Sequence, residues 1–406
     1  MNDSGSAPDG QAPEEKLPRR DWLLLPLLSL FTIYLVLAGV TGIANRMFRE
    51  PILAVDKCLV TSDKSTGIRA VPHTTCSEQF PEGGRVEYTF NGCGHRADVD
   101  CGPKTPGTFR IVGLGSSFSY GLHVQREQSF LPLLAETLSR QTGRQIEIYN
   151  ESMFGQWPRS LTLHLDEVFA AKPDMILWTF TPSDVEFSSM VLWSEFDPVT
   201  LPEEVIKAGF FSRTWYRVKV SFANNSIKDA TLYLWNYEIG VFKTSLRGLL
   251  LQHILYASQR RYVNSYLNGA DADVGFLRAV PSGEWHSNLR AFDEDATKLE
   301  ERARAEGVPL VAALLPNRAQ AAMISMGVWP KGFDPYLIAS EVRSIITRHG
   351  GTYVDILPYF RTISNPERNY FPVDGHPDAR GHAMLSEALS KGLMTGNVPA
   401  LSVPAK

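Results

Sequence analysis

The sequence predicts a three-layer α/β/α fold built on a parallel sheet of five strands. Short apolar runs alternate with segments of helical spacing, at 109–114, 146–150, 174–180, 308–316 and 352–356. The third run, DMILWTF, is continuously apolar, which is typical of a strand covered on both faces. Strands separated by helices form a parallel sheet through right-handed crossovers. We therefore expect one α/β domain over 108–395.

Helical spacing accompanies the predicted strands, at 127–141, 158–171, 290–306, 335–348 and from Ala379 onward. The segment between the third and fourth strands, about 187–289, is too long for a loop in a compact domain. We expect it to form a helical insertion. Charged side chains within 230–263 argue against a second membrane span, since charges are costly at mid-bilayer. An amphipathic helix packed on the domain is the favoured interpretation, and a helix at the membrane interface is the alternative.

The N-terminal region contains a charge-free apolar segment. Residues 22–44 are 23 residues without a charged side chain, and a helix of that length crosses the ~30 Å hydrocarbon core. A cleaved signal peptide has a shorter apolar core of roughly 7–15 residues. We therefore predict a transmembrane helix at 21–45. Residues 1–20 are rich in Ser, Gly, Pro and charge, which predicts a disordered cytoplasmic tail. Residues 396–406 are interpreted as a C-terminal tail.

All four cysteines lie in a 44-residue stretch after this segment: Cys58, Cys76, Cys93 and Cys101. No pair has zinc-site spacing. Of the three possible pairings into two disulfides, Cys58–Cys76 with Cys93–Cys101 fits best. Disulfides persist in oxidising compartments, so we expect a single-pass protein of the bacterial inner (cytoplasmic) membrane with its C-terminal domain in the periplasm. We call residues 46–107 the cap.

Composition narrows the choice of partners. The formal net charge of −4 and the pI near 6.2 give no electrostatic basis for a nucleic-acid partner. The nine histidines are scattered and no HExxH motif occurs, so we expect no metal and no cofactor. His123, two residues after Gly121, could face the site at the end of the first strand, but we predict it to be a surface residue.

The chemistry is expected where the first strand ends, in GLGSSFSYG (113–121). Ligands bind beyond the carboxyl ends of parallel strands. Phe118 stands where a dinucleotide-binding fingerprint requires Gly, and Ser119 stands at the last Gly of a GxSxG elbow. A serine-rich structural turn is the other alternative.

A partner for this turn follows the last strand. FPVDGHPDARGH (371–382) supplies an acid and a histidine. A hydroxyl becomes a strong nucleophile only when a base takes its proton and an acid orients that base. We therefore predict Ser117 as nucleophile, His376 as base and Asp374 as acid, brought together at one edge of the sheet.

These segments resemble the SGNH (GDSL) hydrolase family, which has a flavodoxin-like sheet. GSSFSYG (115–121) and DGHP (374–377) resemble its first and last blocks, and YNESMFGQWP (149–158) is similar to its second. TFTPSDVEF (179–187) lies where the third block, GxND, belongs, and NGCGHR (91–96) resembles the NxxGxR segment of membrane-anchored relatives. The resemblance covers about 109–186 and 308–391.

The resemblance implies an oxyanion hole formed by Ser117, Gly155 and Ser183. Ser116 replaces the Asp of GDS, and Ser183 replaces the oxyanion Asn of the third block. The family usually places its Asp three residues before the His, where Val373 stands. Asp374 stands two before, a spacing also found in alginate-acetylating relatives.

The expected function is hydrolysis of O-acyl esters, on envelope or extracellular glycans, through an acyl-Ser117 intermediate. One alternative is an O-acetyltransferase that modifies a polysaccharide through the same acyl-serine. The other is a catalytically inactive SGNH-like protein that binds glycan or acts as a scaffold.

Overall fold

The computed structural model describes residues 21–47, 58–61, 68–80, 82–97, 99–190, 215, 219, 258–268, 272–395 and 398–401. A parallel five-stranded sheet with strand order β6-β5-β7-β8-β9 forms the centre of the α/β domain. Its strands are β5 (Phe109–Leu114), β6 (Ile146–Asn150), β7 (Met175–Phe180), β8 (Leu310–Leu314) and β9 (Thr352–Tyr353). The predicted five-stranded α/β fold is confirmed.

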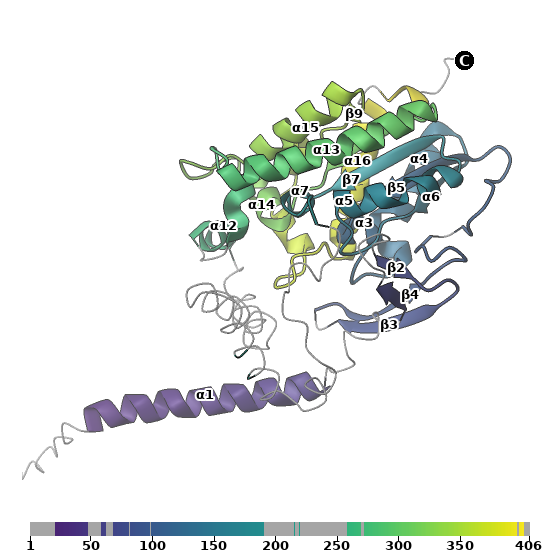
Figure 1. Cartoon of the computed structure of the whole chain (residues 1–406). Helices are drawn as coiled ribbons and strands as arrows, with labels where there is room; N and C mark the ends of the chain where they lie inside the picture. Colours follow the sequence, from purple (N-terminus) through teal and green to yellow (C-terminus); the bar gives the residue numbers. More distant parts are fainter. Residues whose placement is uncertain are drawn as a thin grey trace, which may run out of the picture.

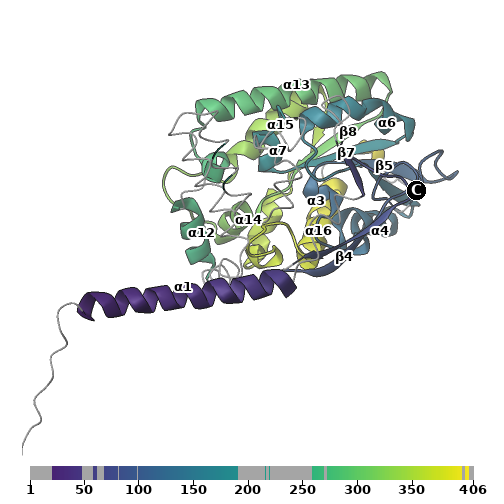
Figure 2. The same cartoon turned by 60° about the horizontal axis from the view of Figure 1, so that its bottom comes forward.

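Helices cover both faces of this sheet. Every residue of β5, β7 and β8 is buried. Figure 2 shows α13 and α15 on one side of these strands and α4 and α16 on the other, and each pair is in contact. The bounds are α4 (Phe130–Thr142), α13 (Gly283–Ala305), α15 (Leu337–His349) and α16 (Ala379–Thr395). The unbroken apolar strand sequences follow from this double cover.

The shorter helices complete the described part of the fold. They are α3 (Ser117–Tyr120), α5 (Pro158–Leu161), α6 (Leu165–Ala170), α7 (Pro182–Glu186), α12 (Gln259–Asn268) and α14 (Arg318–Met326). The described 3-10 segments are η1 (Arg126–Gln128), η2 (Thr162–His164), η4 (Ala272–Leu277), η5 (Leu357–Thr362), η6 (Pro366–Asn369) and η7 (Pro399–Leu401). The single helix expected at 158–171 is therefore divided into α5, η2 and α6.

Two helices differ from the sequence prediction for local reasons. α13 begins at Gly283 rather than at 290, because the Ser282 side chain accepts a hydrogen bond from the Trp285 N–H at 3.3 Å and caps the helix. α14 was not predicted. Most of its residues are buried, so it lacks the polar face that makes helical periodicity visible.

The N-terminal segment forms α1 (Asp21–Met47), a helix over the residues predicted as a transmembrane segment. Among the described residues, no helix combines the length and apolar character needed to cross a membrane, so the predicted span at 21–45 is not supported. The predicted tail at 1–20, residues 191–257 of the insertion apart from 215 and 219, and residues 402–406 lie outside the described residues. The described part of the insertion contains α12, η4 and the start of α13.

The cap contains two antiparallel hairpins. They are β1 (Leu59–Thr61) with β2 (Ile68–Ala70), and β3 (Thr75–Phe80) with β4 (Gly84–Thr89). The disulfide Cys58–Cys76 joins the start of the first hairpin to β3, and Cys93–Cys101 closes the segment after β4. The predicted pairing is confirmed. Figure 1 shows β3 and β4 below α3, beside the carboxyl edge of the sheet.

Arg96 joins the cap to the turn that follows β5. Its side chain is 1% exposed. It donates hydrogen bonds to the carbonyl oxygens of Tyr120 at 3.1 Å, Gly121 at 2.6 Å and Val124 at 2.7 Å. Its guanidinium carbon lies 4.4 Å from the centre of the Tyr88 ring. The NxxGxR segment thus has a physical role, because its arginine donates to three carbonyl groups of this turn.

Replacing this arginine tests that role. Arg96→Met keeps much of the apolar volume but leaves the carbonyl groups without their donor. We expect a loss of about 2–4 kcal/mol in the free energy of unfolding, measured by denaturant titration of the full chain. Arg140→Met is the control, because the Arg140 side chain is 66% exposed; its effect should stay within about 0.5 kcal/mol. Equal effects of the two substitutions would contradict this role.

Candidate active site

Ser117 is the first residue of α3, three positions beyond the end of β5. It is partly exposed, whereas every other residue from 108 to 121 is buried. The turn is tight, because a Cβ on Gly115 would lie 2.2 Å from the Ser119 hydroxyl oxygen. Gly121 ends α3 at φ 78°, in the left-handed region that glycine adopts without strain. The turn therefore presents one hydroxyl, that of Ser117, at the carboxyl edge of the sheet.

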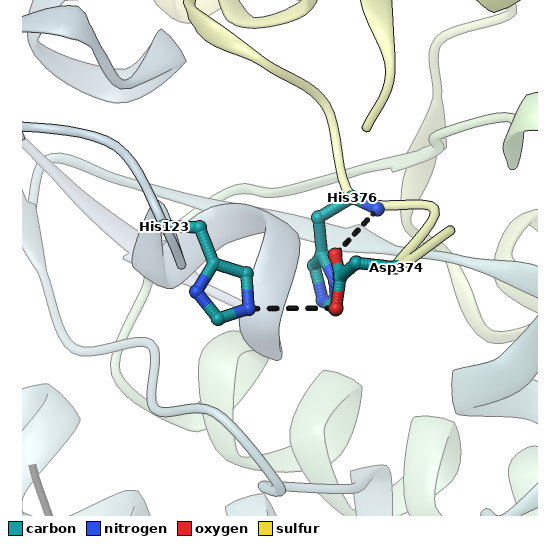
Figure 3. Close-up of side chains that lie close together, drawn as sticks. All are labelled: His123, Asp374 and His376. Carbon is teal, nitrogen blue, oxygen red and sulfur yellow. Dashed lines mark hydrogen bonds and ion pairs between the residues drawn. The ribbon is translucent and has the colours of Figure 1, made fainter. Parts of the chain in front are cut away.

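His376 lies in the loop before α16 and reaches this hydroxyl. Its Nε2 is 2.7 Å from Ser117 Oγ. Its Nδ1 is 2.6 Å from Asp374 Oδ1, and its backbone N–H donates to the same oxygen at 3.0 Å. Figure 3 shows Asp374 and His376 on one turn of chain. The structure thus brings together the three residues that the sequence analysis selected.

The charge state of Asp374 fits an orienting role. Burial raises the pKa of its carboxyl, but the charge of His376 and hydrogen bonds from His123 and His376 lower it well below the usual range. Asp374 is therefore ionised from mildly acidic to alkaline pH. An ionised carboxylate on Nδ1 keeps the Nδ1–H tautomer, which leaves Nε2 free to accept the Ser117 proton.

His123 also lies in the site, and the prediction that it is a surface residue is wrong. Its side chain is 10% exposed, and its Nε2 is 3.4 Å from Asp374 Oδ2 (Figure 3). Its Nδ1 is 3.1 Å from a carboxylate oxygen of Glu78 in β3. Its ring stacks on Phe80 with the ring centres 3.7 Å apart. The sequence carried no sign of this, because Glu78 and Phe80 belong to the cap, far from His123 along the chain.

The two carboxylates change the titration of His123. Burial alone lowers its pKa, but the hydrogen bonds that its ring donates to Asp374 and Glu78, together with the charges of these carboxylates, outweigh burial and raise the pKa to about 9. His123 is therefore a cation at neutral pH. It lies between two anions, so the pair of interactions leaves this part of the site with one net negative charge.

One group of side chains in the described part of the chain has the spacing of a metal site. His123, Asp374 and His376 each offer a donor atom, and these atoms lie within 4.8 Å of one another. The prediction that the histidines are scattered is thus wrong for this pair. The hydrogen bonds of the three residues to one another, to Ser117 and to Glu78 use the same donor atoms. We therefore assign them to this hydrogen-bond network and assign no metal.

Gly155 and Ser183 lie on either side of the nucleophile in the fold. Gly155 has φ 69° in the turn between β6 and α5. Ser183 is exposed in α7, directly after β7. Since β6 and β7 both pair with β5, the two residues follow the strands that flank the strand before Ser117. This topology is compatible with an oxyanion hole, and their role as donors stays a prediction.

Asp184 is a site-proximal residue that the sequence analysis did not select. It is 2% exposed and accepts hydrogen bonds from the Thr181 N–H at 2.6 Å and the Thr181 hydroxyl at 2.9 Å. Burial raises its pKa to about 6, and hydrogen bonds from Ser116 and Thr181 limit the rise. Ser116, at the Asp position of GDS, is itself buried. Ser116, which replaces the Asp of GDS, thus lies beside the carboxyl of Asp184 in α7.

The solved structures that resemble this chain do so only at low sequence identity and low TM-score. Neither a family model nor a curated protein matches this chain. Among solved structures, TesA is 12% identical with a TM-score of 0.35, over 72% of this chain and 99% of that one. A two-domain esterase (CEX) active on acetylated mannans is 11% identical with a TM-score of 0.37, over 73% and 52%. A lipase/acylhydrolase from Enterococcus faecalis is 13% identical with a TM-score of 0.32, over 70% and 95%. At these scores the fold and site rest on the chain's own topology and contacts.

Asp374→Asn tests the orienting role of the carboxylate. The amide removes the negative charge beside His376 and can donate a hydrogen bond to Nδ1, which favours the wrong tautomer. We expect the reaction of Ser117 with a fluorophosphonate to slow by roughly 10³–10⁴-fold, measured as the rate of covalent labelling. The control is Asp166→Asn, since the Asp166 side chain is 90% exposed. A loss of less than tenfold in Asp374→Asn would argue against the role.

Proposed function

We propose that this protein is a serine esterase of the SGNH type that hydrolyses O-acyl esters through an acyl-Ser117 intermediate. The observation that carries the proposal is the continuous hydrogen-bonded series from Ser117 Oγ to His376 at 2.7 Å and from His376 to Asp374 at 2.6 Å. Its members come from two loops at the same edge of a parallel sheet. The first and last sequence blocks that resemble the SGNH family supply all three residues of this series.

The geometry supports a two-step reaction. Ser117 Oγ attacks the ester carbonyl carbon while His376 Nε2 takes the hydroxyl proton, and a tetrahedral intermediate forms. The intermediate collapses, the bond to the alcohol oxygen breaks, and His376 gives the proton to the departing alcohol. Water then attacks acyl-Ser117, with His376 again as base, and releases the carboxylic acid. Asp374 stays ionised throughout and stabilises the protonated His376.

The negative oxygen of each intermediate needs hydrogen-bond donors. We propose the backbone N–H groups of Ser117 and Gly155, and the hydroxyl of Ser183, for this role. A hydroxyl donates one hydrogen bond but is shorter than the Asn side chain of the family. We therefore expect the nucleophile and base to be intact and the oxyanion hole to be weak. The weak oxyanion hole should make kcat low.

The compartment and substrate class are further parts of the proposal. Two disulfides within the cap favour an oxidising compartment outside the cytoplasm. We propose acyl groups on envelope or extracellular glycans as substrates. This choice rests on the family resemblance and on the compartment. Transfer of the acyl group to a sugar hydroxyl instead of water would use the same intermediate.

Ser117→Ala tests the proposed nucleophile. The wild-type protein is expected to hydrolyse p-nitrophenyl acetate and to be labelled by a fluorophosphonate. The variant should lose both activities to the background rate, because no other described residue of the turn presents a hydroxyl. Ser344→Ala, on the exposed face of α15, is the control. A wild-type protein that neither turns over the ester nor takes the label would favour the inactive scaffold.

Ser183→Asn tests the oxyanion hole by restoring the family residue. If the short hydroxyl limits the rate, the longer amide should raise kcat by roughly 10–100-fold, a part of the ~10²–10³ that one donor contributes. Ser183→Ala should lower kcat by less than tenfold and leave KM nearly unchanged. Steady-state kinetics on p-nitrophenyl acetate measures both. A fall of kcat in Ser183→Asn would exclude this position from the oxyanion hole.

A further inference from the structure

The β3–β4 hairpin of the cap supplies two carboxylates that contact the surroundings of Asp374. Glu78 is in β3 and Glu82 is in the turn between the strands. Glu78 contacts His123, which in turn contacts Asp374. Glu82 contacts the backbone of the loop directly. A part of the chain outside the α/β domain therefore touches the acid of the proposed triad along two separate routes.

We propose that Glu78, His123 and Glu82 are positioning residues that hold Asp374 in place, so that the cap hairpin completes the active site. The inference rests on the proposed function and deepens it. The series Ser117–His376–Asp374 is extended by His123 and Glu78 into a chain of five side chains. His123 belongs to the α/β domain but lies outside the sequence blocks of the family, and Glu78 belongs to the cap.

The Glu78 end of the chain is fixed by burial and by a second donor. Glu78 is 3% exposed, and its Oε2 accepts a hydrogen bond from the Tyr88 hydroxyl at 2.7 Å. The same Tyr88 oxygen accepts the backbone N–H of His123 at 3.0 Å. Glu78 and Tyr88 thus hold both the ring and the backbone of His123. Burying a carboxylate without such partners would cost free energy. The Tyr88 hydroxyl and the His123 ring are the partners of Glu78 here.

The backbone of His123 carries a second sign of constraint. Its φ is 55°, in the left-handed region that residues with a Cβ seldom adopt. Such a conformation costs on the order of 1 kcal/mol and persists where the surroundings impose it. Stacking on Phe80 and the contacts to Tyr88 and Glu78 impose it here. The conformation turns the His123 ring back toward Asp374.

Glu82 fixes the loop itself. Its two carboxylate oxygens accept the backbone N–H groups of Val373 at 3.0 Å and of Asp374 at 2.9 Å. Hydrogen bonds to a charged acceptor are about twice as strong as neutral ones. The two bonds set the direction in which the Asp374 side chain leaves the loop. Glu82 therefore acts on the backbone, while His123 acts on the side chain.

The protonation state of His123 decides at which pH the series from Ser117 to Glu78 is intact. The titratable groups that face His123 are Glu78 from β3, Tyr88 from β4, and Asp374 and His376 from the loop before α16. Because the folded-state pKa of His123 is raised to about 9, the stability that its ion pairs contribute is fully present below the unfolded pKa of about 6.5. This stability is lost as the pH rises through about 9. A neutral His123 carries one ring proton. If that proton is on Nδ1, which faces Glu78, Nε2 no longer donates a hydrogen bond to Asp374 Oδ2.

The test is the pH profile of Ser117 labelling by a fluorophosphonate in the full chain, from pH 6 to 10.5. The wild-type rate should fall on an alkaline limb near pH 9. In Glu78→Gln the midpoint of this alkaline limb should shift to lower pH by about 1–2 units, since His123⁺ loses one charged acceptor. At pH 8.5 the labelling rate should then be lower than wild type by roughly tenfold, with near-equal rates at pH 6. Glu87→Gln, an exposed Glu on the same hairpin, should keep the wild-type profile.

His123→Gln provides a second variant, because glutamine can donate to Asp374 but does not titrate. It should slow labelling and remove the alkaline limb near pH 9. An unchanged limb in His123→Gln, or a Glu78→Gln profile that matches Glu87→Gln, would overturn the inference while the proposed function stands. A Glu78→Gln rate lowered by one factor at every pH would also overturn it, as a structural effect. Absence of labelling in the wild-type protein would overturn the proposed function first.

Discussion

The buried guanidinium of Arg96 is the interaction on which the site depends. It satisfies carbonyl groups of Tyr120, Gly121 and Val124, and so holds the chain that leaves the Ser117 turn. His123 lies within that same stretch. Removing the partners of a buried charge is strongly destabilising. The cap, which carries Arg96, and the α/β domain, which carries the turn, therefore fold as parts of one site.

Further contacts repeat this arrangement at other points of the cap. Arg69 of β2 pairs with Glu167 of α6, and Lys104 pairs with Asp174 just before β7. Glu82 reaches the loop before α16. Ion pairs at the surface contribute little singly. Together these contacts join the cap to the α/β domain at both ends of the sheet, since Asp174 precedes β7 and Glu82 contacts the loop before α16.

The sequence predicted the parts that depend on local pattern. Strand β5 followed from an apolar run, and Ser117 with His376 followed from the rule that parallel strands end at one edge. His123, Glu78 and Glu82 could not be predicted, because their contacts join segments more than 40 and more than 290 positions apart and no periodicity marks them. Helix α14 was missed for the opposite reason, since burial on nearly all sides removes the amphipathic signal. Asp184 was overlooked because its neighbour Ser183 stood at the family position.

The disulfide Cys58–Cys76 lies on the same strand as Glu78, two residues away. Covalent closure of the cap therefore constrains the strand that carries this carboxylate. Under the positioning role proposed for Glu78, a chain with reduced thiols would carry Ser117 and His376 but would lack this constraint on the hairpin beside the acid. The proposed activity would then depend on the redox state of the cap.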